Sequence, residues 1–95
     1  MLFRSKGASM IKLTITRVSG EIDECVVTPV IEYAFENYAK KGFRKAFMED
    51  EKQSDIYWLA WECLRRKGVA VKPFGQDFLE TLDKVEVEAV TNPNG

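Results

Sequence analysis

The sequence of 95 residues contains no histidine. This absence excludes Ser-His and Cys-His catalytic pairs and every histidine-ligated metal site. Neither Gly-x-x-x-x-Gly-Lys nor Gly-x-Gly-x-x-Gly occurs, so the chain carries no recognisable phosphate loop. The sequence therefore favours a protein that is not an enzyme, and we expect no catalytic residue, no metal site, no cofactor and no small-molecule substrate.

Long apolar runs are also missing. No run approaches the roughly 20 residues that span a bilayer. The first nine residues, MLFRSKGAS, lack the continuous apolar segment of a signal peptide. We therefore expect a protein of the cytoplasm that does not contact a membrane.

Cysteine is scarce, and the two cysteines, Cys25 and Cys63, lie far apart in the sequence. They fall inside a predicted strand and a predicted helix and do not form a Cys-x-x-Cys pair. A disulfide would need an oxidising compartment, for which nothing in the sequence argues. We therefore expect two buried, free thiols.

Neither sign of charge dominates, since 14 basic residues face 15 acidic ones and the net charge is −1. The protein has no overall field to gather nucleic acid. Residues 40–45, which interleave Phe43 with cations, are the best candidate for nucleic-acid contact. Because Lys40 and Lys41 also suit the end of a helix, we do not expect nucleic-acid binding as the main function. The acidic residues 49–51 are interpreted as a solvated surface.

Size and composition are those of one small domain. The apolar fraction of 45% and the aromatic fraction of 12% are too high for a disordered chain. We expect a flexible leader over residues 1–9, a single globular domain over residues 10–90 and a disordered tail over residues 91–95.

The first half of the domain predicts a β-hairpin followed by helices. Residues 11–18 alternate apolar and polar side chains, and residues 22–28 resume the pattern after a Ser-Gly-Glu turn. Thr28 and Pro29 suit the N-cap and first position of a helix through about Lys41. A short second helix is expected over residues 43–48, and residues 50–55 are either a bend or a continuation into the next helix.

The second half is dominated by residues 54–67, SDIYWLAWECLRRK, which predict a central helix ended by Gly68. A last amphipathic helix is expected over residues 74–84. The fold class is therefore α+β, an N-terminal β-hairpin packed on a small bundle of three to four helices.

The central helix also suggests a protein-interaction site. Its apolar arc is wide, yet Trp58 falls outside it, beside Glu62, so this side chain is either covered by a neighbouring helix or exposed to a partner. We predict Trp58 as an aromatic at an interface. The full set of predicted interaction residues is Trp58, Trp61, Arg65, Phe74 and Phe78, with Arg65 spaced to lie over the Trp61 ring.

The order of these features resembles the tail assembly chaperones of long-tailed bacteriophages. The resemblance rests on IYWLAWECLRR at residues 56–66, FGQDFLETL at 74–82, the acidic and apolar residues 83–88 and an Asn-Pro-Asn ending. It covers mainly residues 54–88. Gly75 and the basic residues 40–45 have no counterpart in it.

The resemblance implies a non-enzymatic protein, the upstream product made without a frameshift. Such chaperones bind the long, helical tape-measure protein in the host cell cytoplasm, promote assembly of tail-tube protein around it and are absent from the mature virion. In many such phages a ribosomal frameshift adds a C-terminal extension that recruits the tail-tube protein. Self-association into a homo-oligomer on one long client is also expected.

Two other classes stay open. One is a small cytoplasmic adaptor, such as a neck protein or a toxin-neutralising partner. The other is a small nucleic-acid-binding regulator, whose binding would depend strongly on salt.

Overall fold

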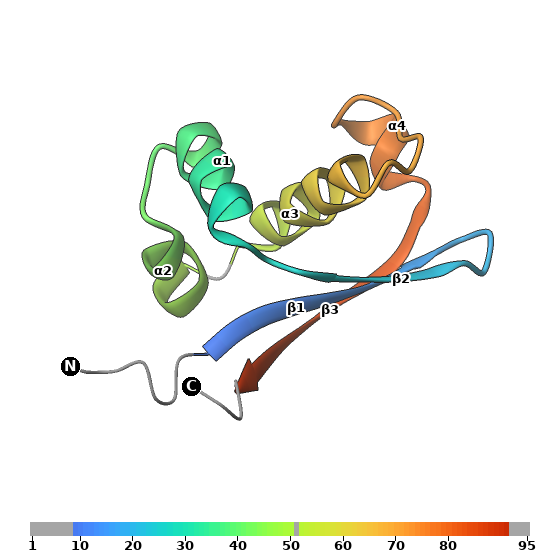
Figure 1. Ribbon diagram of the computed structural model, residues 1–95. Coiled ribbons are helices and arrows are strands. Elements are labelled where there is room, and N and C mark those ends of the chain that lie inside the picture. Colours follow the sequence, from blue (N-terminus) through green and yellow to red (C-terminus); the bar gives the residue numbers. More distant parts are fainter. Residues whose placement is uncertain (1–8, 51, 92–95) are drawn as a thin grey trace.

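A three-stranded antiparallel sheet forms one layer of the molecule, and the helices lie along one of its faces (Figure 1). The computed structural model describes residues 9–50 and 52–91. The strand order is β2-β1-β3, with β1 (Ser9–Arg17) in the centre, β2 (Ile22–Val26) at one edge and β3 (Leu82–Thr91) at the other. The α+β class predicted from the sequence is confirmed, although the sheet has three strands rather than the two of a hairpin.

The alternation along β1 separates the two faces of the sheet. Leu13 and Ile15 are fully buried among the helices. Lys12 points to the opposite face, as expected for a period of two. There its Nζ lies 3.9 Å from Glu24 on β2 and 3.7 Å from Glu88 on β3. The helix-free face is thus charged and crosses all three strands.

The predicted pairing of the first two strands is confirmed. Leu13 lies opposite Cys25, and the Arg17 N–H donates to the Glu21 carbonyl across the turn at 2.9 Å. Gly20 has a φ of 97°, a left-handed conformation that favours glycine.

The last element corrects the prediction of a helix over residues 74–84. Helix α4 spans only Gln76–Leu79, and β3 begins at Leu82. Residues 85–90 alternate apolar and mostly acidic side chains, which suits a strand with one buried face. Pairing with β1 places Val85 opposite Ile15. The central strand supplies hydrogen-bond partners and cross-strand side-chain contacts that a longer helix at this position would not have.

The expected ends of the domain shift accordingly. Ser9, assigned to the leader, and Thr91, assigned to the tail, lie opposite each other in the β1–β3 ladder. The rest of the predicted leader and tail, residues 1–8 and 92–95, lies outside the described residues.

Helix α1 (Pro29–Ala39) begins as predicted. The Thr28 hydroxyl accepts a hydrogen bond from the Ile31 N–H at 3.5 Å, and Pro29 occupies the first turn. The helix ends two residues before Lys41, because Lys40 adopts a left-handed conformation with φ of 60° and its N–H bonds to the Glu36 carbonyl.

The segment between α1 and the central helix is separate from both. It consists of a short helix, α2 (Phe43–Lys45), and a π-helical turn, η1 (Ala46–Asp50). The central helix α3 (Gln53–Arg66) starts after Lys52, which is extended with ψ of 131°. The helix is thus interrupted at Lys52, as the alternative of a bend requires, whereas residues 53–55 already belong to α3. Gly68, with φ of 90°, follows the end of α3 as predicted.

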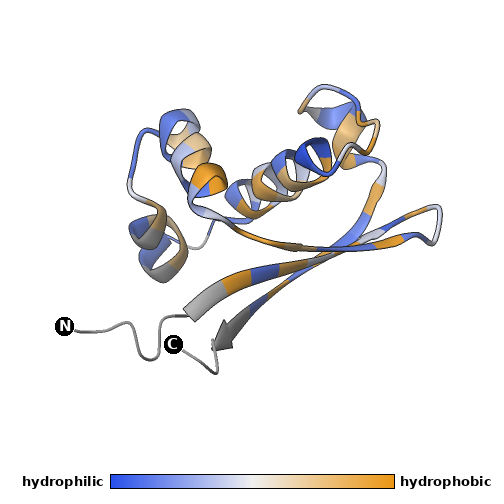
Figure 2. Cartoon of the chain, viewed as in Figure 1, coloured by the Kyte–Doolittle hydropathy of each residue, from blue (hydrophilic) through white to orange (hydrophobic). Residues whose placement is uncertain are grey.

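One apolar cluster joins the sheet to the helices. Its largest fully buried apolar side chains include Phe35 from α1, Leu59 and Leu64 from α3, and Phe78 from α4, packed over Leu13 of β1. Figure 2 shows apolar and hydrophilic residues alternating along the strands and sharing each helix. Helix α3 is therefore central to the fold, as its wide apolar arc predicts.

Candidate protein-interaction surface

A chain of ring contacts connects α1, α2, η1, α3 and α4. Neighbouring ring centroids lie 4.6 to 6.4 Å apart, within the range of favourable aromatic pairs. The members are Phe35, Tyr38, Phe43, Phe47, Trp58, Trp61, Phe74 and Phe78. We call this set the aromatic cluster.

The five residues predicted as an interaction site come together within or beside this cluster. The centroid of Trp61 lies 5.9 Å from that of Trp58 and 6.1 Å from that of Phe74, which is 6.3 Å from Phe78. The guanidinium carbon of Arg65 lies 5.4 Å from the centroid of the Trp61 ring, so the predicted stacking over an indole is confirmed.

Trp58 itself is not exposed, and the prediction of an aromatic poised at the surface is wrong for this side chain. It is 7% exposed. Helix α1 covers it, because Tyr38 stacks on its ring at 4.6 Å and 11° and Phe35 approaches its edge at 6.0 Å. Of the two alternatives for Trp58, coverage by a neighbouring helix is the one observed. Phe78 is also buried, at 1% exposure.

Four rings of the cluster are accessible to solvent, namely Tyr38, Trp61, Phe74 and, at its other end, Phe47. We call Tyr38, Trp61 and Phe74, together with Arg65, the aromatic surface. Tyr38 is 46% exposed, whereas Trp61 and Phe74 are half-buried. The Trp61 Nε1 donates a hydrogen bond of 2.8 Å to the Lys72 carbonyl, which fixes the segment before α4 against α3. Tyr38 is not among the residues predicted for the site from the sequence.

A buried carboxylate supports this surface from below. Glu62 is 1% exposed and accepts hydrogen bonds of 2.9 to 3.1 Å from Nε and Nη2 of Arg65 and a further one from Nε of Arg66. Spacings of three and four residues allow both arginines to reach it from one helix. This spacing is visible in the sequence, but only the contact of Arg65 with Trp61 was predicted from it. The ion pairs with Glu62 were missed.

Cys25 and Cys63 are joined by a disulfide, which corrects the expectation of two free thiols. Both are buried, as predicted. Cys25 points from β2 toward the helices and Cys63 lies on the sheet side of α3, with their Cα atoms 6.1 Å apart, a normal distance for a disulfide. The sequence could not bring the two together because their pairing depends on how α3 packs on the sheet.

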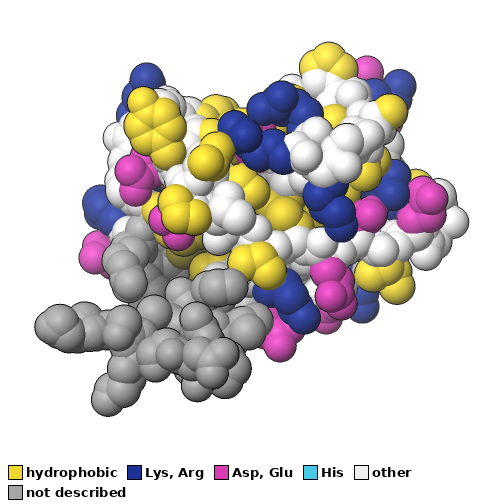
Figure 3. All heavy atoms as spheres, in the orientation of Figure 1, with side chains coloured by type: hydrophobic (Ala, Val, Ile, Leu, Met, Phe, Trp, Pro, Cys, Tyr) yellow, Lys and Arg dark blue, Asp and Glu magenta, His cyan; other side chains and the backbone are white. Residues whose placement is uncertain are grey.

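An open, largely apolar pocket of about 420 Å³ lies over this disulfide, between β2, the start of α1 and the end of α3. Figure 3 shows an apolar hollow in this part of the molecule with Lys and Arg side chains around it. Its lining residues are Glu24, Cys25, Val26, Thr28, Val30, Ile31, Cys63, Arg66 and Lys67.

Two of the basic residues in the range 40–45, Lys41 and Lys45, form ion pairs with carboxylates. The Lys41 ammonium lies 2.9 Å from Asp50 and 3.2 Å from the buried Asp55, and Lys45 lies 3.5 Å from Glu49. The hydrogen bond between Lys41 and Asp50 raises the pKa of Lys41 and lowers the pKa of Asp50. This arrangement ties the end of α1 to η1 and α3, and it leaves these two lysines poorly placed for a phosphate backbone.

Comparison of the chain with protein-family models, with curated proteins and with solved structures gives no match. Among the described residues, no helix has the length and apolar character needed to cross a membrane.

Proposed function

We propose that the protein is a non-enzymatic tail assembly chaperone of a long-tailed bacteriophage or prophage, which binds the tape-measure protein and promotes assembly of the tail tube. In this proposal it acts in the host cell cytoplasm, where Cys25 and Cys63 would be kept as thiols until the disulfide can form. It leaves before the virion is complete. The sheet serves as a platform that holds the helices and the aromatic surface in place.

One observation carries the proposal. The two stretches that resemble such chaperones, residues 56–66 and 74–82, contact each other and form the aromatic surface through Trp61 and Phe74. Solvent-accessible aromatic rings next to an arginine are typical of residues that dominate protein interfaces. The two stretches that carry the resemblance thus also form one continuous surface.

The chemistry of this surface suits an apolar helical client. Tyr38, Trp61 and Phe74 offer flat apolar area with little side-chain entropy to lose. A helix laid on them can bury its apolar stripe, while Arg65 pairs with a carboxylate at its edge. Repeated copies along one client would raise one another's effective concentration, so self-association and recruitment of tail-tube protein fit the same scheme.

A nucleic-acid-binding regulator is the weaker alternative. Two of the basic residues in the range 40–45 that suggested it, Lys41 and Lys45, form ion pairs with Glu49, Asp50 and Asp55. The small cytoplasmic adaptor differs from the chaperone only in its client.

The test is co-elution with the tape-measure protein encoded beside this chain's gene. We expect wild type to co-elute with it on size exclusion, and Phe74→Ala and Trp61→Ala to lose most of that complex. Tyr33→Ala is the matched control, because Tyr33 is 69% exposed and lies outside the aromatic cluster. Each variant is first checked for cooperative unfolding. A folded pair of variants that co-elutes as well as wild type would contradict this use of the surface, and absence of a complex with wild type would contradict the proposal.

A further inference from the structure

The pocket over the disulfide is distinct from the aromatic surface, and its shape and charge point to an occupant. We propose that it is a docking site for an acidic amphipathic helix of a protein partner. The inference does not rest on the proposed function, since it concerns other residues and names the partner only by its chemistry.

The floor and walls of the pocket are apolar. The Cys25–Cys63 disulfide and Ile31 lie at its base, and Val26 and Val30 form its sides with 38% and 55% of their surfaces exposed. Two exposed valines beside a hollow of about 420 Å³ offer burial to apolar side chains of a partner.

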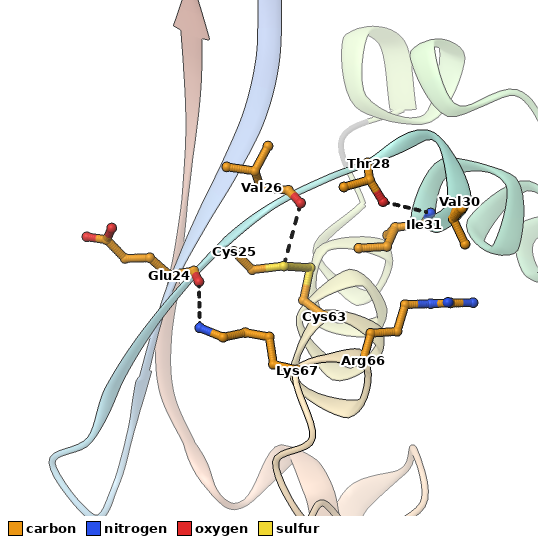
Figure 4. A pocket seen from close by; sticks show the side chains of 9 residues that line it. All are labelled: Glu24, Cys25, Val26, Thr28, Val30, Ile31, Cys63, Arg66 and Lys67. Atoms are coloured by element: carbon orange, nitrogen blue, oxygen red, sulfur yellow. Dashed lines mark hydrogen bonds between the residues drawn. A yellow bond between two sulfur atoms is a disulfide. The ribbon is translucent and has the colours of Figure 1, made fainter.

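The rim is basic. Figure 4 shows the Arg66 side chain reaching from α3 across the pocket toward the start of α1, and Lys67 reaching β2. Within the described residues, Arg66 forms a hydrogen bond only through its Nε, to Glu62. Its Nη atoms can therefore bind a carboxylate of a partner. Three cations, Arg65, Arg66 and Lys67, accompany the single carboxylate of Glu62 in this last turn of α3. The one acid that lines the pocket, Glu24, points its carboxylate to the other side of β2 (Figure 4).

The free edge of β2 favours a helix over a strand as the occupant. A strand added at this edge would need the outward-facing carbonyl of Glu24. That carbonyl already accepts a hydrogen bond of 2.8 Å from the Lys67 ammonium, which also stands across the edge. A helix lying between α1 and α3 needs no backbone partner and can place apolar residues in the pocket and a carboxylate on Arg66.

The C-terminus of any helix attracts cations, so basic residues at the end of α3 can be explained without a partner protein. It does not explain why they border an apolar pocket with exposed valines on its other side. A nucleic acid is a poorer occupant, because it would leave the apolar floor uncovered and the protein as a whole has a net charge of −1.

The test measures binding of the full chain to a synthetic amphipathic helix of about 16 residues, with leucines on one face and glutamates beside them, by fluorescence anisotropy. We expect Arg66→Gln to weaken binding by about tenfold, as for a lost charge-assisted hydrogen bond. Val30→Glu places a carboxylate on the opposite wall and is expected to weaken it at least as much. The side chain of Val30 is largely exposed, and an acid in the first turn of α1 suits the helix dipole, so this variant keeps the fold.

Lys84→Gln is the control. Lys84 is an exposed cation on β3 that belongs to neither the pocket nor the aromatic surface, so its loss is expected to change binding less than about twofold. Peptides with glutamine for glutamate, or serine for leucine, are expected to bind at least about tenfold more weakly.

Several results would overturn the docking site. These are no binding of the acidic helix below about 1 mM, equal affinity of wild type and Val30→Glu, or equal affinity of the serine peptide. Single-stranded DNA would also be added as a competitor. If it displaces the labelled peptide at a lower concentration than unlabelled peptide does, the pocket is a polyanion site instead.

Discussion

At the scale of single residues, burial sets the role of two side chains in α3. Glu62 is nearly inaccessible, while its partners Arg65 and Arg66 keep 49% and 41% of their side chains exposed. The carboxylate thus depends on the arginines more than they depend on it, because Glu62 loses nearly all of its hydration on folding whereas the arginines keep almost half of theirs. Trp58, one turn earlier on the same side, is covered by the rings of α1.

Replacing Glu62 by glutamine keeps its shape but removes the charge that holds both arginines. We expect a loss of about 1–3 kcal/mol in the free energy of unfolding, measured by urea denaturation. Glu21→Gln removes an exposed partner of Arg17 and is expected to cost less than about 0.5 kcal/mol. Equal effects of the two substitutions would contradict a special role for Glu62.

Trp58→Ala is expected to destabilise the protein by about 3–5 kcal/mol, because it removes the ring on which Tyr38 stacks and leaves a cavity beside Phe35. The measurement is again urea denaturation, with Tyr33→Ala as the exposed control, expected within about 0.5 kcal/mol of wild type. A Trp58 variant as stable as this control would show that α1 does not cover the ring.

At the scale of elements, local sequence patterns predict those helices, strands and turns whose structure depends mainly on residues nearby in the sequence. The Thr28-Pro29 start of α1, the β1–β2 pairing and the extent of α3 all follow from caps, turns and periodicity. Trp61, Arg65 and Phe74 were predicted together for the same reason, since they lie on or after one helix. These signals need no knowledge of the tertiary fold.

Features that depend on residues distant in the sequence were not predicted. Residues 74–85 carry apolar side chains near helical spacing, and residues 85–90 alternate like a strand, so the boundary was ambiguous. Pairing with β1, more than 60 residues away, resolves it in favour of β3. Tyr38 over Trp58 and Cys25 against Cys63 likewise depend on how α1 and the sheet pack on α3.

The disulfide joins β2 to α3 across 38 residues of sequence. Closing a loop of this length in the unfolded chain stabilises the fold by about 4 kcal/mol on chain-entropy grounds. We therefore expect reduction with dithiothreitol to lower the free energy of unfolding by up to that amount. The double variant Cys25→Ala, Cys63→Ala is the control, and its stability should not respond to the reductant. A wild type equally stable in both conditions would contradict a bonded pair.

The Lys41 cluster predicts how stability depends on pH. The pKa of Asp50 is lowered, so its contribution is full above its usual pKa and is lost as pH falls through the lowered value. The pKa of Lys41 is raised, so its contribution is full below 10.5 and is lost as pH rises through the higher value.

Lys41→Met should therefore lower the melting temperature near neutral pH, and the difference from wild type should shrink below about pH 4. The measurement is thermal unfolding followed by circular dichroism across this range. Lys12→Met, which loses only surface ion pairs on the open face of the sheet, is the control. A difference between wild type and Lys41→Met that stays constant with pH would exclude the ion pairs as its cause.

At the scale of the whole molecule, the last turn of α3 stands between two surfaces. Arg65 lies over the aromatic surface and Arg66 lines the pocket, and both are held by Glu62. A small protein that offers an aromatic surface and a separate acidic-helix site can hold two segments of one client, or one client and a second protein. Both arrangements suit an assembly chaperone that must bring a helical client and other subunits together.

The most direct test of the central claim is whether the protein keeps its proposed client soluble. Purified tape-measure protein is diluted from denaturant into buffer with increasing amounts of this chain, and its aggregation is followed by light scattering. Wild type is expected to suppress aggregation in proportion to its amount, and folded Phe74→Ala is expected to do so far less. Aggregation that proceeds equally with and without the wild-type protein would contradict it.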